Sequence, residues 1–276
     1  MGLAAASLLL LNSCDMDRYP LTSFSEDTFY DDEANVELAL TGLYRGGITL
    51  GVDYNVSDWW AYSATILLDG VSDIGYDRRG FTNALGQLTS GTITETNLWV
   101  QNLYQKPYRR ISACCRFLDG LNAIAEKTDE MERMEAEARF IRAVQYFYLA
   151  SYYHDVPLVT KTLSLDEANS VKKSSRMEVL QYAADELKDV ANILPRQKDL
   201  PKNELGRATA QAALVYLART YLIMEDFENA AIACGQIIEW GDNQIDPDYQ
   251  GLFYQTGEES SEHIFATQFV DDLAGH

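Results

Sequence analysis

Hydrophobic residues recur with helical spacing along most of the chain. Between Asp31 and Arg45 the apolar positions fall at i, i+3, i+4, i+7 and i+8, the spacing of one buried face of an amphipathic helix. These positions are Val36, Ala39, Leu40, Leu43 and Tyr44. Gly46-Gly47 follows and ends the pattern, so the sequence predicts a helix at 31–45.

The same spacing predicts further helices downstream. They are expected at 59–68, 97–121, 129–153, 175–194, 208–224 and 227–240. Pro107 is expected to kink the second of these, and Ser175 with Glu178 fits a capping box at the start of the fourth. Residues 69–96, rich in Gly, Thr, Ser and Asn, are predicted to form a long connection, and His263 to Val270 has the pattern of one strand.

The last predicted helix pair has a recognisable spacing of small and aromatic residues. The positions are Leu214, Leu217, Ala218, Tyr221, Ala230 and Ile237, and Leu149, Ala150 and Tyr153 repeat the first half. This is the pattern of tetratricopeptide helix pairs, although either copy alone is also compatible with an unrelated helical hairpin. The predicted fold is mainly α, with tetratricopeptide-like antiparallel helix pairs, long irregular loops and little strand.

The composition excludes some classes of function but says less about the fold. The 276 residues suit one or two globular domains, and 42 Asp and Glu against 22 Lys and Arg give a net charge of -20. Such a field repels a phosphate backbone, which argues against nucleic acid as a partner.

The sequence contains few residues or motifs that could serve in catalysis or metal binding. The cysteines lack zinc-type spacing, only three His are present, and no nucleophile elbow or phosphate-binding glycine loop occurs. The acidic run from Asp242 to Asp248 has Pro247 where a calcium loop needs Gly, which favours a surface turn. We therefore expect no catalytic residues, no metal and no cofactor.

The N-terminus resembles a bacterial lipoprotein signal. A short apolar run from Gly2 to Leu11 ends in Leu11-Asn12-Ser13-Cys14, which resembles a lipobox, and charged residues follow at once. The resemblance implies that residues 1–13 are a signal peptide, incomplete because no basic residue precedes the apolar run, and that Cys14 is the lipid anchor. The alternative is a buried N-terminal helix with a chance cysteine.

Several segments, in order along the chain, resemble the SusD/RagB-like family of surface nutrient-binding lipoproteins. The matching segments are ALTGLY at 39–44, Ser72-Asp73, Trp99 with Leu103-Tyr104, ARFIRA at 138–143, Tyr146-Phe147, HDVPLV at 154–159, GRAT at 206–209, LARTYL at 217–222 and EHIF at 262–265. The resemblance implies a helical scaffold over residues 14–276, truncated at the C-terminus, with loops that bind glycan. It also implies an outer-membrane, lipid-anchored, surface-exposed location and a SusC-like TonB-dependent transporter as partner.

Glycan binding requires exposed aromatic rings beside polar side chains, because sugar C–H faces stack on rings while hydroxyls form hydrogen bonds. Two segments have this composition, and the candidate residues are Trp59, Trp60, Asp73, Tyr76 and Arg78. Of the adjacent tryptophans, we expect one to be buried and the other exposed. Core packing of the tryptophans and a solvated loop around Tyr76 are the alternatives, while Trp99 and Trp240 are expected in the core.

Two functions remain open at this point. The first is non-catalytic capture of a glycan or oligosaccharide at the outer-membrane surface and its delivery to the transporter. The alternative is a helical-repeat adapter of the cell envelope that binds other proteins, with its aromatic residues in the core.

Overall fold

The computed structural model describes residues 30, 32–45, 58–60, 62–78, 80–254, 257–258 and 260–267. This part of the chain is mainly helical, as predicted. The predicted signal peptide at 1–13 and the predicted anchor Cys14 lie outside the described residues.

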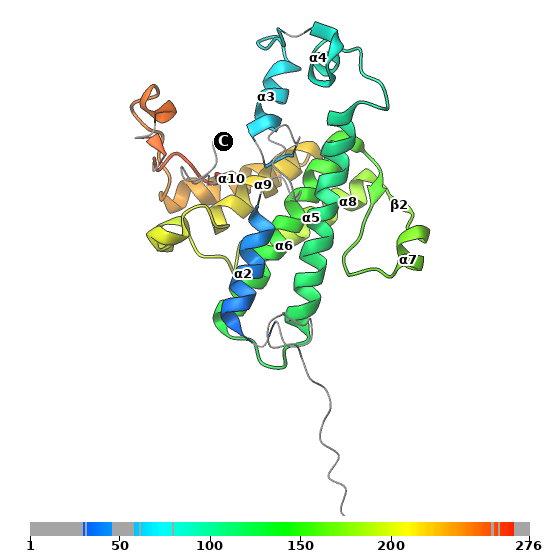
Figure 1. The fold of residues 1–276 in the computed structure, drawn as a ribbon. Helices are drawn as coiled ribbons and strands as arrows, with labels where there is room; N and C mark the ends of the chain where they lie inside the picture. Colours follow the sequence, from blue (N-terminus) through cyan, green and yellow to red (C-terminus); the bar gives the residue numbers. More distant parts are fainter. Residues whose placement is uncertain are drawn as a thin grey trace, which may run out of the picture.

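Long helices dominate, and the strands are two residues each (Figure 1). In chain order the elements are α2 (Glu33–Tyr44), α3 (Tyr62–Gly70), η1 (Gly80–Thr82), α4 (Ala84–Thr89), α5 (Leu98–Asn122), α6 (Asp129–Tyr153), β1 (Val156–Pro157), α7 (Leu165–Ser170), β2 (Lys173–Ser174), α8 (Arg176–Val190), η2 (Gln197–Asp199), η3 (Lys202–Glu204), α9 (Ala210–Ile223), α10 (Phe227–Trp240) and η4 (Gly251–Phe253). The strands β1 and β2 pair antiparallel, with Val156 opposite Ser174.

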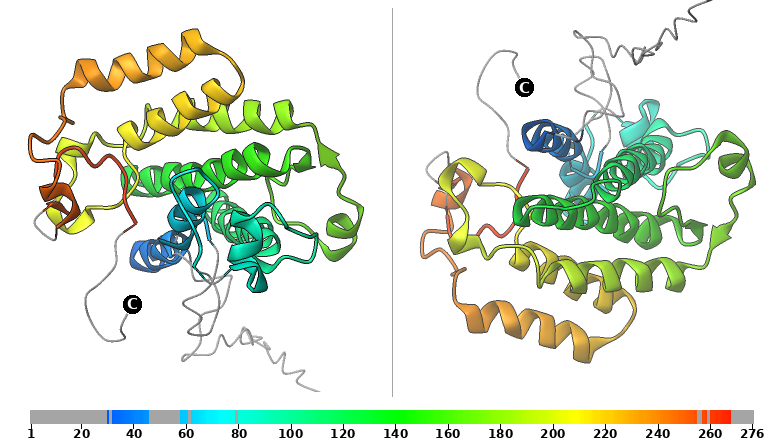
Figure 2. Two further views of the ribbon diagram at one scale, coloured as in Figure 1. Left: turned by 90° about the horizontal axis from the view of Figure 1, so that it is seen from above. Right: turned by 90° about the horizontal axis from the view of Figure 1, so that it is seen from below.

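The helices stack in layers, each packed on the next in the chain. Contacts join α5 to α6, α6 to α8, α8 to α9 and α9 to α10, while α2 lies on α6 and α5. Figure 2 shows α2 and α5 on one side of α6, α8 and α9 on the other, and α10 outermost. This arrangement of successive helix pairs is the tetratricopeptide-like fold that the sequence predicts.

The central helix α6 carries most of the core. It begins behind Thr128, whose side chain accepts a hydrogen bond from the Met131 amide, and its first turn is acidic, which suits the helix dipole. From Ala136 to Ala150 nearly every side chain is buried. A helix that is buried on most sides must be enclosed by neighbours, and the surrounding helices enclose it.

Several predicted bounds are confirmed. The helices α6 and α10 match 129–153 and 227–240, and the Ser175–Glu178 capping box is present at the start of α8. The helix α8 ends at Val190 rather than at 194.

Two predictions about irregular segments are wrong. Residues 69–96 are not a continuous loop, because η1 and α4 lie within them and Asn83 caps α4 by accepting a hydrogen bond from the Gly86 amide (2.9 Å). The predicted strand at 263–270 is absent from its described part, 263–267.

The helix α5 continues through Pro107. Proline has no N–H, so the carbonyl of Leu103, four residues earlier, loses its usual partner within the helix. The indole Nε1 of Trp59 donates to this carbonyl at 3.0 Å. A side chain from another part of the chain therefore replaces the hydrogen bond that Pro107 removes.

Candidate functional site

The two adjacent tryptophans are both buried, with exposed fractions of 7% for Trp59 and 5% for Trp60. The expectation that one of them is exposed is wrong. Trp59 stacks between the rings of Tyr148 and Tyr152, at centroid distances of 4.8 and 4.5 Å. Residues 58–60 form a turn ahead of α3, and Trp60 packs against Tyr44, Phe265 and Arg110.

Beside Trp60 lies a buried ion pair. Arg110 donates to the Asp58 carboxylate at 3.1 and 3.3 Å, and both side chains are excluded from solvent. Arg110 also donates to the carbonyls of Leu43 and Arg45 at the end of α2, and its guanidinium lies 4.7 Å from the Trp60 ring centroid. This one side chain therefore joins α5, the end of α2 and the turn at 58–60.

A cleft of about 830 Å³ opens between α2 and the segment 203–207. Three aromatic side chains line it, namely Tyr44, Trp60 and Phe265. Polar and aliphatic residues complete the wall: Glu37, Leu38, Leu40, Thr41, Gly42, Arg45, Asn203, Glu204, Leu205, Gly206, Arg207 and Thr267. Its size is that of a small-molecule pocket.

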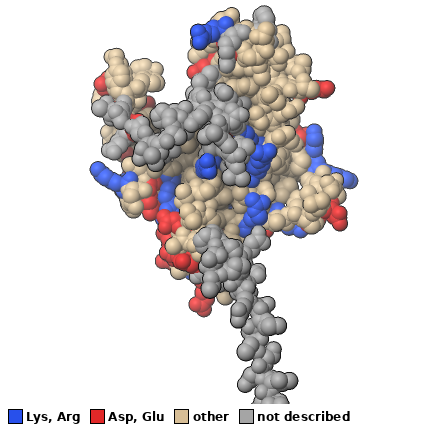
Figure 3. Space-filling model, viewed as in Figure 1, with Lys and Arg blue, Asp and Glu red and all other residues tan. Residues whose placement is uncertain are grey.

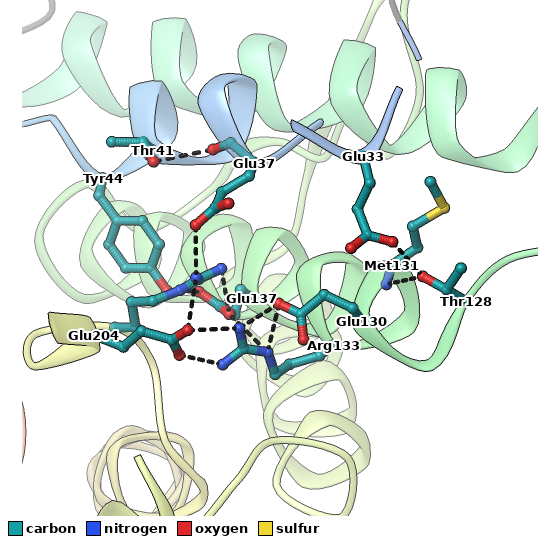
Figure 4. Close-up of polar contacts among 11 residues, drawn as sticks. Glu33, Glu37, Thr41, Tyr44, Thr128, Glu130, Met131, Arg133, Glu137 and Glu204 are labelled. Carbon is teal, nitrogen blue, oxygen red and sulfur yellow. Dashed lines mark hydrogen bonds and ion pairs between the residues drawn. The ribbon is translucent and has the colours of Figure 1, made fainter. Parts of the chain in front are cut away.

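A network of hydrogen bonds and ion pairs borders this cleft (Figure 4). The Tyr44 hydroxyl donates to Glu137 at 2.5 Å and accepts from the Ala208 amide at 2.9 Å. Arg207 pairs with the other oxygen of Glu137 at 3.0 Å, and Arg133 pairs with Glu204 at 2.5 Å. Burial raises the pKa of the Glu137 carboxyl, although Arg207 opposes the shift, and burial also raises the pKa of Tyr44.

These polar groups are already engaged with one another. The network ties α2, α6 and the segment 204–208 together, so its first role is to hold the cleft in shape. The sequence motifs ALTGLY and GRAT, noted for their family resemblance, contribute Tyr44 and Arg207 to it. The sequence does not show that they meet in space, because Tyr44 and Arg207 are 163 positions apart.

The other three sequence candidates lie elsewhere. Asp73, Tyr76 and Arg78 are exposed in the segment between α3 and η1, and 84% of the Tyr76 side chain is exposed. They follow the C-terminal end of α3, whereas the tryptophans precede its N-terminal end, and a nine-residue helix is about 13 Å long. The structure therefore separates the five candidates into a buried group and an exposed group.

The exposed group lies at the end of the molecule where α3 and α4 project from the helical stack (Figure 1). Ser72 accepts from the Ile74 amide and donates to the Asp69 carbonyl, which braces the start of the segment. In Figure 3 this upper part of the surface carries few charges, while acidic and basic side chains mix over the lower part. An exposed ring beside Arg and Asp has the composition of a carbohydrate contact.

Within the described part of the chain, no group of His, Cys, Asp and Glu is arranged to hold a metal ion. No helix among those residues is long and apolar enough to cross a membrane.

Comparison with known proteins identifies the family. A family model of SusD-like proteins, described as starch-binding and associating with the outer membrane, matches residues 78–222. The chain belongs to the SusD-like family. A SusD-like protein, P25, from Formosa agariphila is 24% identical over 95% of this chain and 50% of its own length.

Solved structures of SusD-like proteins share the fold. A SusD-like carbohydrate-binding protein from Bacteroides fragilis is 45% identical, with a TM-score of 0.81 over 86% of this chain and 46% of that chain. Surface glycan-binding protein A from Bacteroides thetaiotaomicron, solved with laminarihexaose, is 20% identical, with a TM-score of 0.68 over 84% of this chain and 48% of that chain. The chain spans about half the length of the curated relatives it matches.

The segment that follows α10 is held to the core by one strong ion pair. Arg196 donates to both oxygens of Asp242 at 2.7 and 2.6 Å, and Gln211 donates to the same carboxylate at 2.8 Å. The hydrogen bonds from Arg196 lower the pKa of Asp242 below its usual value.

This pair gives a prediction about pH. A carboxyl with a lowered pKa in the folded state adds stability above its unfolded pKa of about 3.9, and that stability is lost as the pH falls through the lower folded pKa. Asp242→Asn is therefore expected to be less stable than the wild type at pH 7, with the difference shrinking below about pH 4. Urea unfolding at pH 7 and pH 3 measures this.

The matched control is Asp73→Asn, which changes an exposed carboxylate in the segment after α3. It should alter stability little at either pH. An Asp242→Asn variant whose stability deficit is the same at both pH values would contradict the assignment.

Proposed function

We propose that this SusD-like protein captures carbohydrate at the outer-membrane surface without changing it chemically, and delivers it to a TonB-dependent transporter. Membership of a family described as starch-binding carries the proposal. The 45% identical relative from Bacteroides fragilis, named as carbohydrate-binding, supports it. Titration of the folded protein with neutral polysaccharides tests it, because a folded protein that binds none of them would contradict the proposal.

The segment after α3 is the proposed carbohydrate contact. Tyr76 would stack on a sugar ring, and Asp73 and Arg78 would form hydrogen bonds with its hydroxyls. Trp59 and Trp60 are proposed to act indirectly, since they pack the turn from which α3 and this segment extend.

Tyr76→Ala is expected to weaken carbohydrate binding about five- to tenfold, because stacking on an aromatic ring is worth about 1 kcal/mol. The melting temperature should not change, since the side chain is mostly exposed. Titration calorimetry and thermal melts measure the two effects.

Tyr76→Phe is the control, because it retains the ring and should retain most of the affinity. Equal binding by the alanine variant and the wild type would remove Tyr76 from the site.

Lipid anchoring is proposed through Cys14. Cys14→Ala is expected to release the protein from the membrane fraction, because the acyl chains would be lost. Cys234→Ala is the matched control, since this exposed thiol lies on α10 and its loss should leave the protein in the membrane fraction. Unchanged fractionation of both variants would contradict the lipoprotein proposal.

A second candidate, the protein-interaction adapter, is favoured by one observation. The outermost helix α10 exposes Phe227, Ile232 and Ile238, and it contains no Lys or Arg. Exposed apolar side chains on one helix without a basic residue favour contact with another helix.

Affinity purification from solubilised envelopes separates the two candidates. Recovery of a TonB-dependent transporter supports glycan capture and delivery. Recovery of an unrelated envelope complex, lost on Ile238→Lys, supports the adapter.

A further inference from the structure

Three aromatic side chains crowd an exposed loop after α10. Tyr249 and Phe253 are each 74% exposed and Tyr254 is 57% exposed. The rings of Tyr249 and Phe253 lie 5.3 Å apart at 71°, so they form a pair rather than two isolated groups. Clustered aromatic surface in water is unfavourable, and such patches mark binding sites.

The loop is braced at its base, where its two ends meet. Asp246 donates its amide to Glu262 at 2.8 Å and accepts from the Ser260 hydroxyl at 2.7 Å. Asn243 donates to the Ser261 carbonyl at 3.0 Å, and Gln197 donates to the His263 carbonyl at 2.8 Å. The first three bonds join the two ends of the loop, and the bond from Gln197 connects the loop to η2.

The tip has its own hydrogen bonds. Asp248 accepts from the Gly251 amide at 3.0 Å, and Gln250 donates to the Tyr254 hydroxyl at 2.8 Å. Within residues 248–254 these hydrogen bonds join the residues that present the rings to solvent. A ligand that stacks on them would find the surface already formed, which reduces the entropy cost of binding.

The negative charge of the loop indicates which kind of ligand it can bind. From Asn243 to Glu262 the chain contains Asp246, Asp248, Glu258, Glu259 and Glu262, but no Lys or Arg. At the base, Arg196 is paired with Asp242, and Lys198 on η2 also acts on this carboxylate. Phosphorylated, sulfated or uronic-acid ligands would be repelled, whereas neutral sugars can bind carboxylates, phenol hydroxyls and amides through their hydroxyl groups.

We propose that Tyr249, Phe253 and Tyr254 form a carbohydrate-contact site for neutral glycans, in addition to the segment around Tyr76. Because the paired rings are steeply inclined, one stacks beneath a sugar residue while the other contacts its side or the next residue. Asp248 and Gln250 lie beside the rings and supply hydrogen-bonding groups. The two loops lie at separate places on the molecule in every view (Figures 1 and 2). This inference rests on the proposed carbohydrate-binding function.

The test compares four forms of the protein in titrations with starch and laminarihexaose, which are neutral, and with polygalacturonate, which is anionic. They are the wild type, Tyr249→Ala/Phe253→Ala, the ring-retaining Tyr249→Phe/Phe253→Tyr, and the control Phe227→Ala, which removes an exposed ring from α10. The alanine pair is expected to bind at least one neutral glycan about tenfold more weakly than the wild type, at an unchanged melting temperature. The ring-retaining pair and Phe227→Ala should bind like the wild type.

Three results would overturn the inference while leaving the proposed function intact. The first is undiminished binding of every neutral glycan by the alanine pair, and the second is binding of polygalacturonate that depends on these rings. The third is a melting temperature lowered in step with binding, which would show that the rings pack against protein. A wild type that binds none of the glycans would instead contradict the proposed function itself.

Discussion

Trp59→Ala is expected to lower the free energy of unfolding by about 3–5 kcal/mol, the usual cost of removing a large buried aromatic side chain. Two effects combine at this position. Removing the indole would leave a cavity where Tyr148 and Tyr152 now stack on it. The Leu103 carbonyl, which has no partner within the helix because of Pro107, would also lose its hydrogen-bond donor. Urea unfolding monitored by circular dichroism measures the change.

Two variants separate these effects. Trp59→Phe keeps a ring between the tyrosines but removes the indole N–H, so it should cost about 1–3 kcal/mol, the penalty for an unpaired buried acceptor. Tyr76→Ala, at an exposed ring, should change stability by less than about 0.5 kcal/mol. A Trp59→Ala variant of normal stability that binds carbohydrate poorly would contradict the buried position of this ring.

Arg110→Met is expected to cost a similar amount, about 3–5 kcal/mol, because it leaves the Asp58 carboxylate buried without its partner. The carbonyls of Leu43 and Arg45 at the end of α2 would also lose their donor. The loss should appear as a lower urea midpoint, with α2 detaching more readily in hydrogen exchange.

Arg109→Met is the matched control, since Arg109 precedes Arg110 on α5 and is exposed. The Arg109→Met variant should have nearly the same free energy of unfolding as the wild type. Arg110→Met/Asp58→Leu should recover part of the loss, because the stranded charge is removed. Equal stability of the Arg109 and Arg110 variants would contradict the role given to the ion pair.

The helical scaffold could be predicted because its signals are local. In α6 and α10 the apolar spacing, the acidic first turn and the residues that end the helix all indicate the same bounds. Both helices have these predicted bounds. The short helix α4 was missed because six residues with Gly and Thr carry no clear periodicity, and its start depends on the Asn83 cap. The strand pattern at 263–267 is overridden by packing, since Phe265 contacts Trp60 and Phe140 in the core.

The candidate site was harder to predict because burial depends on distant residues. Trp59 packs against Tyr148 and Tyr152, which are about ninety positions away in the sequence. It also donates to the carbonyl in α5 that Pro107 leaves without a hydrogen-bond partner. The exposure of Tyr76 follows from its place beyond α3. The paired rings of Tyr249 and Phe253 had a sequence signal, namely aromatic residues within a polar, acidic loop, but their exposure needed the structure.

We propose that the protein binds neutral carbohydrate and leaves it intact. Isothermal titration calorimetry of the intact, folded protein with starch and with laminarihexaose tests it most directly, with a reducing-sugar assay on the same samples. The expected result is saturable binding of a neutral glycan and no release of reducing sugar. A folded protein that binds neither of these glycans, or that cleaves the one it binds, would contradict the claim.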